Sequence, residues 1–264
     1  MFSISEDNYY SSEANWQYMS VSQYKDFLQC EAAAIAKLNG WQPSSDQTAL
    51  YVGNYVHSYF ESSKSHETFK EVNKERLFSS RKPYGLLKTY QVAESMIDAL
   101  NHQKSFKMLY QGNKEAIVTG ELYGVDWKAK IDCLNIEGGY FVDIKTTKGP
   151  MNRKIWNEKY GERVSWVADY GYILQMAVYQ RLLELRYGKI LTPIIAAVSK
   201  EDPPAFRLIT LDEQMMLFEI SQLAQNIDHI SNVKNGVEAL TYCGECEYCR
   251  RNMQITEFVN SENL

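Results

Sequence analysis

The chain has 264 residues, of which 45% are hydrophobic and 23% are charged. These values are ordinary for a soluble globular protein and argue against disorder, a collagen-like repeat or a coiled coil. The formal net charge of −5 gives no sign of the positive coat that many nucleic-acid-binding proteins carry. The N-terminus lacks a basic, apolar leader, and no apolar run approaches the roughly 20 residues of a membrane span. We therefore expect a cytoplasmic protein without membrane contact.

Hydrophobic periodicity predicts one α/β or α+β domain, with helices, a small sheet, a helix and then further strands. In chain order, the expected elements are a helix from Ser20 or Ser22 to Leu38, helices over Asp46–Ser62 and Leu86–Tyr110, strands at Glu115–Tyr123, Val125–Asn135 and Gly139–Thr146, a helix over Val167–Tyr187, strands at Ile190–Ser199 and Ala205–Thr210, and a helix over Leu211–Lys234. Residues 151–164 are charged and are expected to be irregular.

Two aspartates and a lysine lie on the predicted hairpin around Gly138–Gly139. Asp143 and Lys145 are two residues apart on one strand and share a face, and pairing brings Asp132 near Asp143. Two carboxylates of this kind suit Mg²⁺ or Mn²⁺, and a neighbouring lysine can orient an attacking water. The alternative is an ordinary charged hairpin, but the apolar residues around Asp143 indicate a buried strand, where charges are costly.

A second pattern places a small residue, an imidazole and a carboxylate at intervals of four. Gly53, His57 and Glu61 therefore lie along one stripe of the predicted helix. His57 can supply a nitrogen ligand to a metal held by the aspartates, or it can be a half-buried structural histidine.

A third pattern lies on the helix after the strands. Tyr172, Gln175 and Tyr179 fall on one face of it, at i, i+3 and i+7. A glutamine flanked by tyrosines can hold a phosphate, a base edge or the lysine. The alternative is an amphipathic helix with tyrosines at its boundary.

Three cysteines lie within seven residues near the C-terminus, at Cys243, Cys246 and Cys249. Their spacing suits one metal ion or cluster but leaves a fourth ligand position, for which Cys30 is the candidate. Both an iron–sulfur cluster and Zn²⁺ are possible, and the presence of Cys30 favours iron–sulfur. Cys133 is expected to be a small core residue.

The charge is unevenly distributed along the chain. Residues 32–200 carry 23 basic and 17 acidic side chains, and within this block residues 127–164 carry eight Lys or Arg against five Asp or Glu. The overall negative charge therefore hides a basic middle that can attract a phosphate backbone.

Together these motifs resemble the PD-(D/E)XK nuclease superfamily, in particular its RecB-like and RecE-like exonuclease branches. The matching residues occur in the family's order: Gly53-x₃-His57-x₃-Glu61, then Ile131-Asp132, then Asp143-Ile144-Lys145-Thr146, then Gln175-x₃-Tyr179. The resemblance implies the restriction-endonuclease-like α/β fold and a single nuclease domain in residues 1–264, with tails at 1–19 and 251–264 and a core at 20–250. Ala129 departs from the family, which often has glycine there.

The resemblance also implies the roles of these residues. His57, Asp132, Asp143 and the Ile144 carbonyl would bind Mg²⁺ or Mn²⁺, Lys145 would position the attacking water, and Gln175 and Tyr179 would hold the site or the DNA. The expected function is a metal-dependent exonuclease acting on ends of linear duplex DNA in phage or prophage recombination or repair.

Further expectations follow from the same family. Such enzymes often work beside a single-strand annealing protein, and the RecE-like members form homo-oligomeric rings. One cysteine before the core and three after it resemble the 4Fe–4S domain of AddB-type proteins, although the last three are more closely spaced here. Two alternatives to the exonuclease are an endonuclease of the same superfamily and a non-catalytic DNA-binding or scaffolding protein.

Overall fold

The computed structural model describes residues 3–44, 46–252, 254, 258 and 260–263. Its chain forms two compact units. The first contains Met1–Ser44, Glu121–Trp127 and Leu223–Leu264, and the second contains Ser45–Gly120 and Lys128–Gln222. Each unit is described by itself below, and the expectation of a single domain stays a prediction.

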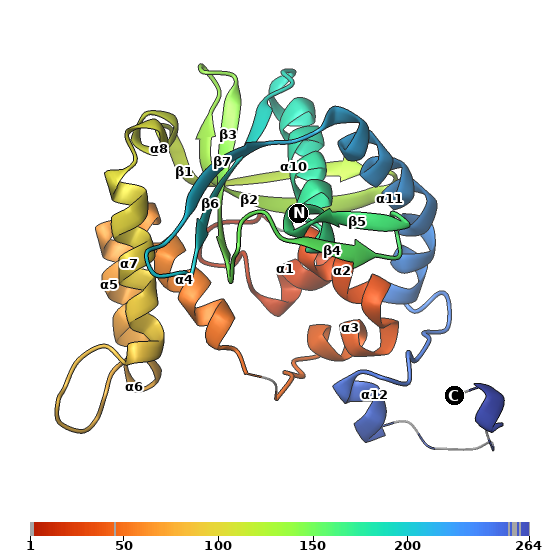
Figure 1. The fold of residues 1–264 in the computed structure, drawn as a ribbon. Coiled ribbons are helices and arrows are strands. Elements are labelled where there is room, and N and C mark those ends of the chain that lie inside the picture. The colour runs from red at the N-terminus through yellow and green to blue at the C-terminus, as the bar shows by residue number, and fades with distance from the viewer. Residues whose placement is uncertain (1–2, 45, 253, 255–257, 259, 264) are drawn as a thin grey trace. The chain divides into compact units, whose positions relative to one another are not determined.

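The larger sheet of the described residues has five strands in the order β1-β2-β3-β6-β7 (Figure 1). The strands are β1 (Asn113–Leu122), β2 (Val125–Asn135), β3 (Tyr140–Thr147), β6 (Thr192–Ser199) and β7 (Phe206–Thr210). β3 pairs with β2 in antiparallel and with β6 in parallel fashion, and β6 and β7 are antiparallel. This mixed sheet with helices confirms the predicted α/β fold class.

Helices cover this sheet within the second unit. They are α4 (Thr48–Glu61), α5 (Ser63–Val72), α6 (Lys74–Leu77), α7 (Lys88–His102), α8 (Lys104–Leu109), α9 (Trp166–Asp169), α10 (Tyr172–Tyr187) and the start of α11 (Glu213–Lys234). The apolar residues of α4 and α7 pack on alternate residues of β3 and β6, including Val142, Ile144 and Ala196. α10 also contacts β6. Because side chains alternate along a strand, Asp143 and Lys145 are directed away from this apolar cluster.

Three predicted elements of the second unit differ from the structure. The long helix at 86–110 is divided at Gln103 into α7 and α8, and the helix at 167–187 is divided by Gly171, whose φ of +67° is left-handed. Residues 151–164 are not irregular, because they contain a hairpin of β4 (Lys154–Asn157) and β5 (Glu162–Ser165). This hairpin was missed because its exposed alternate residues are mostly charged.

The first unit is mainly helical. It contains α1 (Ser12–Gln17), α2 (Val21–Gln29), α3 (Glu31–Leu38), the end of α11, α12 (Glu247–Asn252) and a short 3₁₀ helix at Ser261–Asn263. Residues 1–19, expected to be a tail, contain α1 and the fully buried Met19, which bridges to Trp127. The single helix expected up to Leu38 is two helices, because Cys30 between them has extended backbone.

Among the described residues, no helix is both long enough and apolar enough to cross a bilayer.

Candidate active site and metal centre

The predicted aspartates meet where β2 and β3 separate. The paired register runs from Asn135↔Tyr140 to Cys133↔Val142, so the next step brings Asp132 opposite Asp143. At this step Oδ2 of Asp132 accepts the Ile144 backbone N–H at 2.7 Å. A side chain thus takes the place of a strand-to-strand hydrogen bond, and both carboxylates are held at the fork between the strands.

Lys145 lies beside Asp143, as predicted from their shared face. Its Nζ is 2.6 Å from Oδ2 of Asp143, and the two side chains are 12% and 3% exposed. The two groups therefore form a buried ion pair. Burial raises the pKa of Asp143 to about 6, although Lys145 opposes the shift. Burial lowers the pKa of Lys145, but Asp143 and Asp132 outweigh it and the net shift is upward.

His57 reaches the same fork from α4. Its Nδ1 is 3.2 Å from Oδ2 of Asp132. Burial lowers the pKa of His57, but the negative charge of Asp132 more than offsets this, so the pKa is raised. The pKa of Asp132 is lowered because His57, Lys145 and the Ile144 N–H together outweigh its burial. Glu61, on the same helix stripe, accepts a hydrogen bond from Ser65 instead.

Tyr172, on the tyrosine–glutamine face of α10, contacts the site. Nζ of Lys145 lies 4.6 Å from the ring centroid of Tyr172, within the range of a cation–π interaction. Gln175 donates a hydrogen bond from Nε2 to the hydroxyl of Tyr179 at 2.9 Å. These two side chains therefore bond to each other, whereas Tyr172, for which no separate role was predicted, contacts the lysine.

Sequence reasoning missed a buried ion pair next to Asp132. Glu115 of β1 has a φ of +50°, which is strained for a residue with a side chain, and its Oε2 is 2.8 Å from Nζ of Lys130. Lys130 precedes Asp132 by two residues and shares its face of β2. Burial and the charge of Asp132 raise the pKa of Glu115 to about 7. The sequence spacing did not indicate that Glu115 lies near Asp132, because β1 comes well before the aspartates in the sequence.

The residues at the fork fit a divalent cation. They offer two carboxylates and an imidazole, and oxygen ligands are what Mg²⁺ and Mn²⁺ prefer. The two carboxylates are buried and share the single ammonium of Lys145, and a divalent cation would balance the remaining negative charge.

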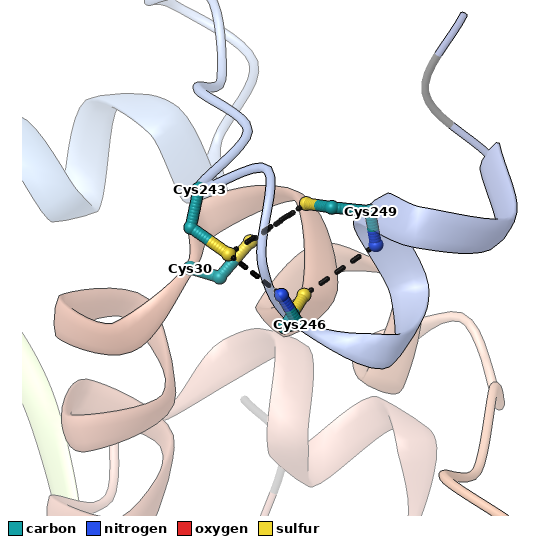
Figure 2. Close-up of side chains that lie close together, drawn as sticks. All are labelled: Cys30, Cys243, Cys246 and Cys249. Atoms are coloured by element: carbon teal, nitrogen blue, oxygen red, sulfur yellow. Dashed lines mark hydrogen bonds between the residues drawn. The ribbon is translucent and has the colours of Figure 1, made fainter. Parts of the chain in front are cut away.

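The four predicted cysteines come together in the first unit (Figure 2). Their ligand atoms all lie within 4.8 Å of one another, and Sγ of Cys249 is 3.5 Å from Sγ of Cys30 and 3.8 Å from Sγ of Cys243. The backbone N–H groups of Cys246 and Cys249 are directed at the sulfurs of Cys243 and Cys246. Such hydrogen bonds favour thiolates, and they help to lower the pKa of Cys243 to about 6. Cys133 lies apart from this group, in β2, as predicted.

Polar side chains brace the cysteine segment. Glu31, next to Cys30, accepts hydrogen bonds from both the backbone and the hydroxyl of Thr241 and from Nε2 of His229. Glu247 of α12 binds the backbone and hydroxyl of Ser44. The loop before Cys243 and the helix that holds Cys249 are thus both fixed to residues near α3, which orients the sulfurs before any metal binds.

Two comparisons with known proteins find a matching family and a similar structure. Residues 20–252 match a family described as a PDDEXK-like domain of unknown function. The crystal structure of a "putative exonuclease" from Eubacterium rectale is similar, with 34% sequence identity, a TM-score of 0.90, and 98% of this chain and 97% of that chain covered. The crystal structure of SSO0001 aligns at 12% identity and a TM-score of 0.30, over 83% of this chain and 91% of that chain. A comparison with curated proteins gives no significant match.

Proposed function

Because the chain belongs to the family of PDDEXK-like domains, we propose that it is a metal-dependent nuclease that hydrolyses phosphodiester bonds of DNA. The observation that carries the proposal is the buried fork of Asp132, Asp143 and Lys145, in which two nearly inaccessible carboxylates share one ammonium. Two buried carboxylates beside a lysine are expensive for stability and have no packing role there, so a catalytic role explains them.

The residues at the fork divide the work as follows. Asp132, Asp143, His57 and the Ile144 carbonyl would hold Mg²⁺ or Mn²⁺. When bound, such a cation polarises a phosphate and lowers the pKa of a water molecule. Lys145, fixed between Asp143 and the ring of Tyr172, would orient the attacking water and offset the charge developing on the phosphate. Gln175 and Tyr179, joined by a hydrogen bond, would support the side of the active site that faces the DNA.

We favour an exonuclease acting on ends of linear duplex DNA, in recombination or repair of phage or prophage origin. The support is the similarity in sequence and fold, over nearly the whole chain, to the protein described as a "putative exonuclease". A single-strand annealing partner and a ring of identical subunits belong to the same proposal. An endonuclease would use the same fork on a different DNA topology, and a scaffolding protein would bind DNA without cutting it.

The test is digestion of matched DNA substrates by the wild-type protein. We expect linear duplex DNA to be degraded to nucleotides or short products with Mg²⁺ or Mn²⁺, and closed circular DNA of the same sequence to stay intact. Cleavage of the circle would replace the exonuclease by an endonuclease. Intact linear DNA with either metal, combined with salt-sensitive DNA binding, would favour the scaffolding protein.

We also propose that the four cysteines hold a single Zn²⁺ ion. Four sulfurs at a Zn–S distance of about 2.3 Å around a tetrahedral ion lie about 3.8 Å apart. The separations of Cys249 from Cys30 and Cys243, 3.5 and 3.8 Å, are close to this value, and all four sulfurs lie within 4.8 Å of one another. In a 4Fe–4S cluster each cysteine binds a different iron at the corner of a cube, so the sulfurs lie further apart. The compact sulfur arrangement therefore favours zinc over the iron–sulfur cluster that the sequence favoured.

Glu115 pairs with the ammonium of Lys130, which shares a face of β2 with the proposed metal ligand Asp132. Glu115→Gln removes the negative partner, so Lys130 can pair with Asp132 and compete with the cation. We expect the Mn²⁺ affinity, measured by electron paramagnetic resonance without DNA, to fall by about 10-fold or more. The double variant Glu115→Gln/Lys130→Met should restore most of the affinity. An unchanged affinity in the single variant would show that the ion pair has no part in metal binding.

A further inference from the structure

The β4–β5 hairpin presents a tryptophan between two basic side chains. In its register Trp156 is opposite Arg163, and Lys154 is opposite Ser165. Because side chains alternate along a strand and opposite residues share a face, Lys154, Trp156 and Arg163 lie on one face of the hairpin. All three are exposed, and Trp156 is 56% exposed, which is unusual for so large an apolar side chain.

The exposure of Trp156 does not result from a loose hairpin. Lys159 and Tyr160, in the turn, both contact the carboxylate of Glu219, whose side chain is 2% exposed. Asn157 donates a hydrogen bond to Asp169 of α9 at 3.1 Å. The other face of the hairpin includes the buried Val164. The hairpin is therefore anchored by its turn and its inner face. On its outer face, Arg163 donates a hydrogen bond to the backbone carbonyl of Lys154 at 3.3 Å, a contact within the hairpin that leaves both side chains exposed.

The charge of this segment suits an anionic polymer. Five basic residues lie between positions 148 and 163, against two acidic ones, Glu158 and Glu162. Glu158 accepts a hydrogen bond from the indole N–H of Trp156 at 3.0 Å, which fixes the orientation of the ring. Aromatic rings on which bases stack, with cations beside them for the phosphates, are the usual means of binding single-stranded nucleic acid.

The hairpin is also connected to the candidate active site within the second unit. β5 leads directly into α9, whose first residue, Trp166, lies with its ring 6.0 Å from that of Tyr172. The Tyr172 ring is in turn the one next to Lys145. A DNA strand bound along the hairpin face would thus lie on an element that continues into α9. Trp166 of α9 packs against Tyr172, the ring next to Lys145.

A cavity of about 760 Å³ also opens near the base of the hairpin, where Ser165 and Trp166 line it together with Arg207. Glu201 and Asp212 line the same cavity, and their charges oppose a run of phosphates there. The hairpin face is therefore the better candidate for the DNA backbone.

We propose that the face formed by Lys154, Trp156 and Arg163 binds a single-stranded segment of the DNA substrate, such as a frayed or processed end. Trp156 stacks on a base, and Lys154 and Arg163 contact the flanking phosphates. The inference rests on the proposed nuclease function for its choice of ligand, but it assigns residues outside the metal fork.

The experiment measures binding of a labelled 20-nucleotide oligo(dT) by fluorescence anisotropy, in the Asp132→Asn background and without added divalent metal. Trp156→Ala is expected to weaken binding by about 5- to 150-fold, the range of one lost base–aromatic stack, and Trp156→Phe by much less. Lys154→Met and Arg163→Met should each reduce the slope of the logarithm of the binding constant against the logarithm of the salt concentration by about one, the contribution of one phosphate contact. Tyr84→Ala removes another exposed aromatic ring, 69% exposed, and serves as the matched control with unchanged binding.

Two further readouts separate the outcomes. Oligo(dT) should quench tryptophan fluorescence in the parent protein, and Trp156→Phe should abolish that quenching. Unchanged affinity in Trp156→Ala overturns the proposed surface, even if the wild-type protein cuts DNA as proposed. Conversely, Trp156-dependent binding by a wild-type protein that leaves all DNA intact retains the surface and rejects the nuclease. No binding of oligo(dT) by the parent protein overturns the surface.

Discussion

Replacement of Lys145 by methionine is expected to reduce cleavage of linear DNA by at least about 10²-fold, the scale of losing one charged group that acts at the reacting phosphate. Methionine retains the length and apolar stem of the side chain but removes the ammonium that lies 2.6 Å from Asp143. The stability of the protein should not decrease in parallel. The measurement is the initial rate of release of acid-soluble nucleotides at saturating Mg²⁺.

Asp132→Asn is the companion variant, and a similar loss of activity is expected. An asparagine oxygen can still accept the Ile144 N–H, so the fork keeps its hydrogen bond while it loses the negative charge. Lys64→Met makes the same chemical change as Lys145→Met at an exposed position of α5 and should leave the rate unchanged. If Lys145→Met or Asp132→Asn, folded as judged by thermal melting, cuts DNA at the wild-type rate, the proposed role of the fork is wrong.

The fork was predictable because its geometry is local. Asp132, Asp143 and Lys145 belong to two strands joined by one short turn, so alternation and hairpin pairing were enough to bring them together. His57 comes from a distant helix, and periodicity alone showed only which stripe of that helix it occupies. Its placement next to Asp132 was anticipated through the order of motifs shared with a known family.

Other features depend on tertiary contacts that no local pattern encodes. Glu115 lies at the site because a strained residue of β1 is held next to β2, and a single sequence gives no sign of that strain. The β4–β5 hairpin is stabilised by contacts of Lys159 and Tyr160 with Glu219, which is about 60 residues away. Charged residues that look irregular in the sequence can form strands when a distant partner anchors their turn.

The spacing of the cysteines indicated a metal site but did not identify the metal. Either choice requires Cys30 to approach the C-terminal cysteines, and the structure brings these four residues together. The distinction lies in how far apart the sulfurs are, which depends on the packing of α3 against α12 and is not encoded in a C-x₂-C-x₂-C spacing.

Loss of the cysteine centre is expected to have the largest effect on stability. Cys249 is fully buried in a small cluster with Cys30, Ala32 and Ala33, so the apolar contacts that hold this segment are few. A structural zinc ion supplies folding free energy directly, with apparent values of about 10–16 kcal/mol in small zinc domains. Cys249→Ser removes one ligand, and we expect zinc to be lost and the melting temperature to fall by at least about 10 °C.

Metal analysis of the purified wild-type protein should accordingly find about one zinc ion per chain and no visible colour. Cys133→Ser is the matched control, because Cys133 is buried in β2 and bonded to Lys114, outside the four-cysteine group. It should cost some packing energy but leave the zinc content unchanged.

A brown anaerobic preparation that contains iron and sulfide would reject zinc in favour of an iron–sulfur cluster. Stoichiometric zinc that persists in Cys249→Ser would instead show that Cys249 is not a ligand. A bound zinc ion is the expected result, because the four sulfurs lie within 4.8 Å of one another and thiolates this close together repel one another unless a cation lies between them.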